Sequence, residues 1–300
     1  MARFAFAVIP ILFLTGCASK TIDDSNSLAD AGIVYSSSMD DFFGKVIGYT
    51  TEYSNFALLH YSKVPVNQTP SKLSSQMKLE DDKTITEAKD LEAIKIRVAL
   101  TSGYFTSLKK MANDKSDKEI SEESASLVTK VDSGNKVFGT NKLSDEDKGY
   151  IDQITSNAAK AYKAGKISAS LKQATPYIAK ELIIHKKALA AFSSVYIGNL
   201  KDYSDNNYAN SVKEPYIKHV KNLNAESWGK ERKEWITIQS KLAHFDIVKT
   251  APDTMLDLLY KTTNGEGASI SALQDRVEIQ QFAAFVDSLS IDTSAGVKND

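Results

Sequence analysis

Residues 177–200, YIAKELIIHKKALAAFSSVYIGNL, decide the fold class, because their apolar side chains recur at helical spacing. Steps of three and four residues separate these side chains, which places them on one face of a helix. They are Ile178, Leu182, His185, Leu189, Phe192 and Tyr196. Lys180, Lys186 and Lys187 lie off that face. The segment therefore predicts an amphipathic helix that buries one side.

The same spacing recurs on both sides of this segment. It predicts helices over about 28–63, 84–111, 216–250, 255–260 and 269–290. No segment alternates apolar and polar residues with a period of two, as half-buried strands do. With only 14 Gly and 6 Pro in 300 residues, long helices can run uninterrupted. We predict an all-α fold, a multi-helix bundle of about six to eight helices with several long amphipathic ones.

Prolines and polar stretches predict where the helices end. Pro65 and Pro70 should end the first helix, Pro176 should start or kink one, and Pro252 should end another. Residues 264–267 (NGEG) predict a turn. The polar segment 112–149 should be mostly loop with a short helix near 119–130, and helical pattern resumes from residue 143. The Asn- and Asp-rich segment 201–215 should connect two helices.

The N-terminus carries a targeting signal. Arg3 precedes an apolar run, residues 4–14 (FAFAVIPILFL), which is too short for a transmembrane helix of about 20 residues. The tetrapeptide Leu14-Thr15-Gly16-Cys17 follows, and it resembles the lipobox of bacterial lipoproteins. The resemblance implies that residues 1–16 are a signal peptide and that Cys17 carries fatty acyl chains such as palmitate. An ordinary secretory signal with a chance cysteine is the alternative.

The resemblance to lipoproteins also implies a location in the cell envelope. Ala18 follows the cysteine where many lipoproteins kept in the inner membrane have aspartate, so the outer membrane is expected. Whether the chain faces the periplasm or the cell exterior stays open. Residues 17–27 read as a flexible, lipid-anchored tether, 28–290 as a single helical-bundle domain, and 291–300 as a frayed tail. Since Cys17 is the only cysteine, no internal disulfide can form.

Charge and motifs exclude several function classes. With 37 Lys and Arg against 38 Asp and Glu, nothing predicts a nucleic-acid partner. No nucleophile elbow, phosphate loop or dinucleotide-binding glycine pattern is present, so we expect no enzyme, no catalytic residue and no cofactor. The four histidines lack metal-ligand spacing, and Glu181 with His185 does not match a di-iron motif. His185 is instead expected to lie in a helix seam beside Glu181. Gly44 and Gly48 predict close helix packing.

Tyrosines flank the polar connection, at Tyr203, Tyr208 and Tyr216. Tyrosine is favoured at protein interfaces, so these residues form a candidate interaction surface, although tyrosines can equally line a bundle. The leading hypothesis is a lipid-anchored envelope interaction or scaffold module with an envelope protein as partner. One alternative is a binding protein for a small apolar ligand or lipid, in a cavity lined by residues such as Phe42, Phe105 and Trp235. The other is an unrecognised enzyme.

Overall fold

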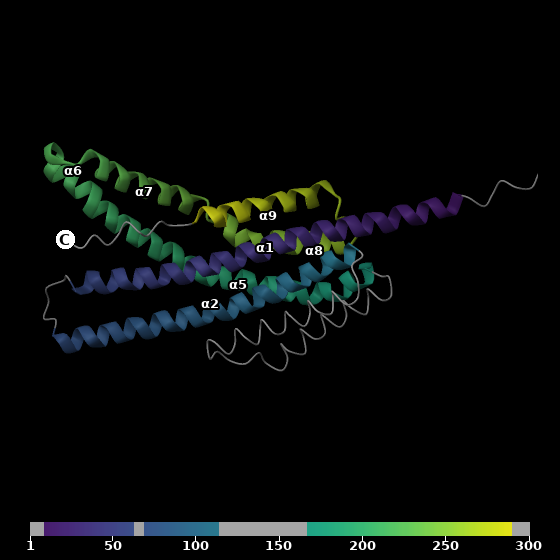
Figure 1. Cartoon of the computed structure of the whole chain (residues 1–300), viewed down its shortest axis with the longest axis horizontal. Coiled ribbons are helices and arrows are strands. Elements are labelled where there is room, and N and C mark those ends of the chain that lie inside the picture. Colours follow the sequence, from purple (N-terminus) through teal and green to yellow (C-terminus); the bar gives the residue numbers. More distant parts are fainter. Residues whose placement is uncertain (1–8, 63–68, 114–166, 290–300) are drawn as a thin grey trace, which may run out of the picture. The chain divides into compact units, whose positions relative to one another are not determined.

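The computed structural model describes residues 9–62, 69–113 and 167–289. All helices in these ranges are drawn in Figure 1: α1 (Ile9–Ser62), α2 (Pro70–Ala112), α5 (Ile167–Asn207), α6 (Glu214–His219), α7 (Ala225–Ala243), α8 (Asp246–Thr263) and α9 (Ile270–Ser288). A π-helical turn, Tyr208–Lys213, joins α5 to α6, and a 3-10 turn, Val220–Asn222, follows α6. These ranges contain no β-strand, so the predicted all-α fold with several long helices is confirmed.

The chain divides into two compact units rather than the single domain expected over 28–290. The first draws on residues 1–40, 94–185 and 251–284, and the second on 41–93, 186–250 and 285–300. Each change from one unit to the other falls inside a helix of the described chain, in α1, α2, α5, α8 and α9. No change of composition marks such boundaries, so they could not be predicted from local sequence.

The core of the first unit is built by the seams that the sequence predicted on α1, α2, α5 and α9. The side chains of Tyr35, Phe105, Ile178 and Phe282 are all fully buried there. Phe105 lies directly over Gly32 of α1, where an added Cβ would come within 2.2 Å of the ring. The missing side chain at Gly32 therefore lets Phe105 pack against the α1 backbone. Full burial of one such aromatic contributes roughly 1.5–3 kcal/mol.

An aromatic cluster forms the core of the second unit. The Phe42 ring packs edge-on against Phe43, Tyr196 and Phe245, with centroid distances of 5.5, 6.1 and 5.9 Å. Tyr49 adds a contact to Tyr196 at 5.1 Å. Edge-to-face pairs at these distances contribute roughly 0.5–1.5 kcal/mol each beyond burial. The predicted seam residues of α1 and α5 thus meet in this cluster.

Local signals in the sequence account for several helix ends. Pro70 is the first residue of α2, and the side chain of Thr69 accepts a hydrogen bond from the Lys72 amide at 3.4 Å. Proline suits this position because the first helical amides have no partner inside the helix. Pro70 therefore starts a helix, whereas we had expected it to end one. Pro65 lies outside the described residues.

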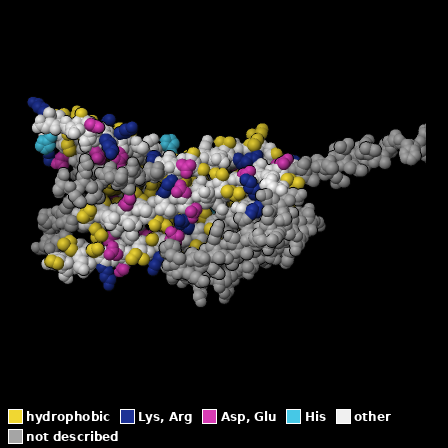
Figure 2. Space-filling view, in the orientation of Figure 1, with side chains coloured by type: hydrophobic (Ala, Val, Ile, Leu, Met, Phe, Trp, Pro, Cys, Tyr) yellow, Lys and Arg dark blue, Asp and Glu magenta, His cyan; other side chains and the backbone are white. Residues whose placement is uncertain are grey.

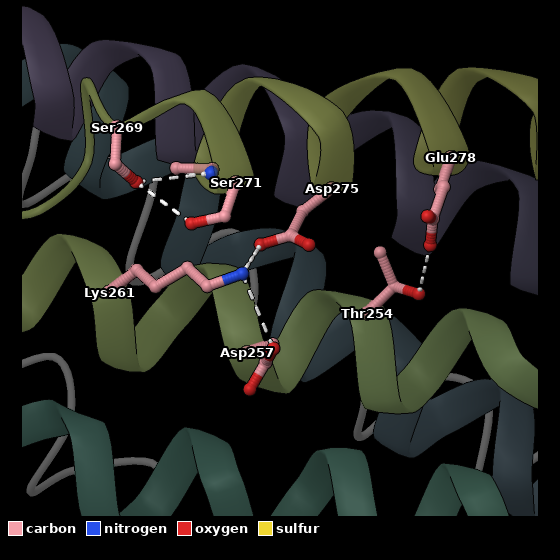
Figure 3. Close-up of polar contacts among 8 residues, drawn as sticks. Thr254, Asp257, Lys261, Ser269, Ser271, Asp275 and Glu278 are labelled. Atoms are coloured by element: carbon pink, nitrogen blue, oxygen red, sulfur yellow. Dashed lines mark hydrogen bonds and ion pairs between the residues drawn. The ribbon is translucent and has the colours of Figure 1, made fainter.

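The turn predicted at residues 264–267 is confirmed, and it folds α9 back along α8. Gly265 has a φ of 82°, and the amides of Gly265 and Glu266 donate to the carbonyls of Thr262 and Lys261 at 3.0 and 2.8 Å. This pair of bonds satisfies carbonyls at the end of α8, and it requires the left-handed conformation that glycine adopts easily. Figure 3 shows the side chains that then join the two helices. Lys261 of α8 reaches Asp275 of α9 at 2.7 Å.

The region expected to be a flexible tether is helical. Residues 17–27 lie within α1, and the side chains of Asp24 and Ser25 are buried. Asp24 lies against Gly267, where an added Cβ would come within 2.8 Å of the aspartate Cβ. Lys20 donates to the carbonyl of Gly265 at 3.5 Å. These contacts of Lys20 and Asp24 with glycines of the α8–α9 turn stabilise a helix over a polar sequence. Apolar periodicity does not reveal such contacts.

Two expected breaks are also helical. Residues 201–215 continue α5 into the π-helical turn and α6, so they do not form an irregular connection. Pro252, expected to end a helix, lies inside α8. Its neighbours Val248, Ala251 and Met255 are all buried, so packing holds this helix despite the lost backbone hydrogen bond. The real interruption in the predicted helix 216–250 lies between α6 and α7, and a second one lies at residues 244–245.

Close packing at Gly48 is not found, because nothing lies within 4 Å of a Cβ added there. Pro176, for which we left two possibilities, lies inside α5. The predictions for residues 114–166, including the short helix near 119–130, and for the tail 291–300 lie outside the described residues.

Candidate functional site

A buried ion pair links α2 to α5 in the first unit. The Arg97 guanidinium donates to both carboxylate oxygens of Glu181, at 3.0 and 2.9 Å. Glu181 is only 2% exposed, whereas the Arg97 side chain keeps 23% of its surface. This bidentate geometry is the strong form of the Arg–carboxylate pair. Glu181 therefore faces Arg97, although the sequence suggested it as the neighbour of His185.

His185 lies one turn further along α5, and its partner is a phenol. The Nδ1 atom of His185 is 3.3 Å from the Tyr35 Oη, and both side chains are fully buried. Burial, together with the nearby Arg97 charge, lowers the pKa of His185 to about 3, so the imidazole is neutral. Burial also raises the pKa of Tyr35 well above its usual value. The neutral phenol can thus donate its proton to Nδ1.

These four side chains form two buried hydrogen-bonded pairs, Arg97 with Glu181 and Tyr35 with His185, and the Nε2 of His185 has no hydrogen-bond partner among the described residues. His185, Tyr35 and Glu181 do not reach the surface, so a substrate has no contact with them in this arrangement. No three His, Cys, Asp or Glu side chains within the described ranges gather as a metal site would require. The Arg97–Glu181 pair can fix α2 against α5, and the Tyr35–His185 pair can fix α1 against α5, because each bond needs its partner at a defined place.

An open groove runs between α1 and α9 on the first unit. Its volume is about 540 Å³. The α1 wall is short and consists of Ser27, Asp30 and Ala31. The α9 wall is longer, and it combines apolar, amide and basic side chains: Leu273, Arg276, Val277, Gln280, Gln281 and Ala284.

The α9 wall of the groove is an apolar stripe that faces outward. Leu273 is 52% exposed and Val277 55%, and Ile270 beyond the end of the groove is 84% exposed. The opposite face of α9, with Ile279 and Phe282, is buried. The helix thus has one stripe for the core and a second one without a partner in the described chain.

Two of the three tyrosines predicted as an interaction surface, Tyr208 and Tyr216, lie on a hairpin of the second unit. In Figure 1, α7 runs back along the end of α5 and α6. Tyr208 stacks on Trp235 at 4.3 Å, and Tyr216 stacks on Trp228 at 5.6 Å. Tyr203 packs separately against Phe56 at 5.2 Å. Only Tyr216 of the three predicted tyrosines is widely exposed. Tyr208 joins the two sides of the hairpin, whereas Tyr203 packs α5 against α1.

The chain matches no family model, no curated protein and no solved structure. Its function therefore has to be argued from its own surfaces. We find no helix in the described ranges with a stretch long and apolar enough to pass through a bilayer.

The residues expected to line a ligand cavity are each packed by neighbours within their own unit. Phe105 fills the space over Gly32 in the first unit, and Phe42 is enclosed by other aromatic rings in the second. Trp235 stacks on Tyr208, and its Nε1 donates to the Asp205 carboxylate at 3.1 Å.

The groove was not predicted, although the amino-acid sequence contains a signal for it. Ile270, Leu273, Val277 and Ala284 follow one another at steps of three, four and seven residues, which is helical spacing. They are offset from the seam of Ile279, Phe282 and Val286. Two apolar stripes on one helix predict two contacts, and only one of them can be the core.

Proposed function

We propose that this chain is a lipid-anchored bacterial envelope protein whose helical part binds an amphipathic helix of another envelope protein. The observation that carries the proposal is the groove between α1 and α9, with its exposed stripe of Leu273 and Val277. Grooves with apolar anchors at three- and four-residue steps suit an amphipathic helix. The lipobox-like tetrapeptide ending at Cys17 supports the anchor.

The rim of the groove adds a charge requirement. Arg276 lines the α9 side and makes no ion pair with any described residue. Asp30 on the α1 side already pairs with Lys109 at 2.6 Å. The free cation therefore favours a partner helix with a carboxylate beside its apolar stripe, because an unmatched interfacial charge weakens binding.

Photo-cross-linking inside cells tests the groove. A photoreactive amino acid at position 281 should trap one partner, and Val277→Glu should lower the yield about tenfold or more by placing a charge in the apolar contact. Arg276→Glu should lower it as well. Ile236→Glu, at an exposed apolar residue of α7, is the matched control and should leave the yield unchanged. Equal yields in Val277→Glu and Ile236→Glu would refute groove binding, as would the absence of a cross-link.

The anchor is tested separately at Cys17. Cys17→Ala should abolish incorporation of an alkyne-labelled fatty acid and leave the uncleaved precursor, because the acylated thiol is gone. Gel mobility and in-gel labelling in cells measure both effects. A Cys17→Ala chain that is cleaved normally and released as a soluble protein would contradict the lipoprotein assignment.

A further inference from the structure

The hairpin of the second unit ends in a cluster of exposed apolar side chains, which we call the hairpin tip (residues 213–228). Tyr216 is 54% exposed, Ile217 68% and Val220 54%. They lie on one side of α6 and of the turn that follows it, since their spacing is one and three residues. Figure 2 shows hydrophobic side chains among basic, acidic and histidine side chains over the α6–α7 end of the structure. Three neighbouring side chains exposed to this degree are unusual on a surface that only meets water.

Contacts beneath the tip hold these side chains in place. The Trp228 ring stacks under Tyr216, and its Nε1 donates to the Val212 carbonyl at 3.0 Å. The Arg232 guanidinium lies 5.9 Å from the centre of the same ring. On the neighbouring turn, Asn207 donates to Glu231 at 3.0 Å. These contacts fix the backbone that carries the exposed apolar side chains.

The charge around the tip is positive, although the whole chain carries a formal charge of −1. Within the tip there are three lysines against two glutamates, and the next turns of α7 add Lys230, Arg232 and Lys233 against Glu231 and Glu234. One of these glutamates, Glu214, is paired with Lys218 on the same helix. Lys213 and Lys221 are exposed on either side of the apolar cluster. The tip therefore combines an apolar centre with a basic surround.

We propose that the hairpin tip binds the surface of an anionic phospholipid bilayer. Tyr216, Ile217 and Val220 enter the headgroup region, and the surrounding lysines contact the lipid phosphates. Tyrosine, tryptophan and lysine are favoured where a protein meets a bilayer surface. Protein interfaces, in contrast, are depleted in lysine, and this composition favours lipid over a protein partner. The tip is a different surface from the α1–α9 groove, so the two proposals can fail independently.

The two tryptophans of the chain provide the readout. Trp228 lies at the tip, and Trp235 lies two turns away on α7. The full chain carrying Trp235→Phe is mixed with vesicles of brominated phosphatidylcholine and phosphatidylglycerol, and quenching of Trp228 is recorded. The chain carrying Trp228→Phe reports Trp235 in the same way. We expect strong quenching of Trp228 in vesicles with phosphatidylglycerol, little in pure phosphatidylcholine, and little for Trp235 in either.

Substitutions at the tip separate the contribution of its lysines to vesicle binding from that of its apolar side chains. Lys213→Gln with Lys221→Gln should lower the equilibrium constant for the quenched state of Trp228 about 25-fold, at roughly fivefold per lysine near an anionic surface. Ile217→Glu should abolish quenching, whereas the matched control Ile236→Glu should not. Equal quenching in charged and uncharged vesicles would overturn the proposal. So would the absence of Trp228 quenching, and a protein cross-linked at position 217 in cells would then identify the tip as a protein interface.

Discussion

Arg97→Met is expected to lower the free energy of unfolding by about 3–5 kcal/mol, because it removes the cation that neutralises a buried carboxylate. Glu181 is 2% exposed, so its carboxylate cannot turn to water when the two hydrogen bonds from Arg97 are lost. Urea unfolding followed by circular dichroism measures the change. Methionine retains most of the apolar volume of the arginine, so the effect isolates the charge.

Substitution of the other residue of the pair, Glu181, provides the control for this prediction. Glu181→Gln should cost less, about 1–3 kcal/mol, since the Arg97 side chain is 23% exposed and can be solvated in part. The double variant Arg97→Met with Glu181→Leu should be more stable than Arg97→Met alone, because no charge is then left buried. If Glu181→Gln lowered the free energy of unfolding as much as Arg97→Met, the unequal burial of the two side chains would not explain the size of the loss.

Gly32→Ala is expected to destabilise the protein by about 1–3 kcal/mol, against the usual effect of such a change in a helix. Alanine normally stabilises a helix interior by about 0.5–1 kcal/mol relative to glycine. At Gly32 the new Cβ would lie 2.2 Å from the Phe105 Cγ, and Phe105 is fully buried and has no space to move into. Thermal or urea unfolding shows directly whether Gly32→Ala raises or lowers the stability of the protein.

Gly48→Ala is the matched control, because Gly48 lies on the same helix and nothing lies within 4 Å of its added Cβ. It should stabilise the protein slightly. Replacing Phe105 by leucine should relieve the clash, so the double variant Gly32→Ala with Phe105→Leu should lose less than the sum of the single changes. Additive losses would show that the ring of Phe105 is not what excludes a side chain at Gly32.

The core could be predicted from the sequence because each long helix repeats its apolar residues at one spacing. The α1 seam from Leu28 through Tyr35 and Phe42 to Tyr49 is buried as expected, and so are Leu91 and Phe105 of α2. Periodicity is a local signal, and these helices are long enough to repeat it many times. The boundaries within residues 201–263 depend instead on contacts between distant residues, such as the bond from Trp228 to the Val212 carbonyl. No local pattern encodes these contacts.

The candidate surfaces were predicted in part. The tyrosine count pointed to the α6–α7 hairpin, but stacking with Trp235 and Trp228 decides which tyrosine is exposed, and that pairing cannot be read from spacing. The groove was missed because Leu273 and Val277 form a second apolar stripe, and a pattern does not say which stripe the core covers. The lipobox-like tetrapeptide ending at Cys17 stays a prediction from the sequence alone.

The way the two units share their helices also limits how the gene can be rearranged. Each unit is assembled from three separate stretches of the chain, and the boundaries between the units lie inside five helices. A recombination event that moves one continuous stretch of the gene therefore cannot transfer either unit whole. Any such event would leave half-helices whose apolar faces have lost their partners. Within the described chain, the two units can be inherited, lost or replaced only together.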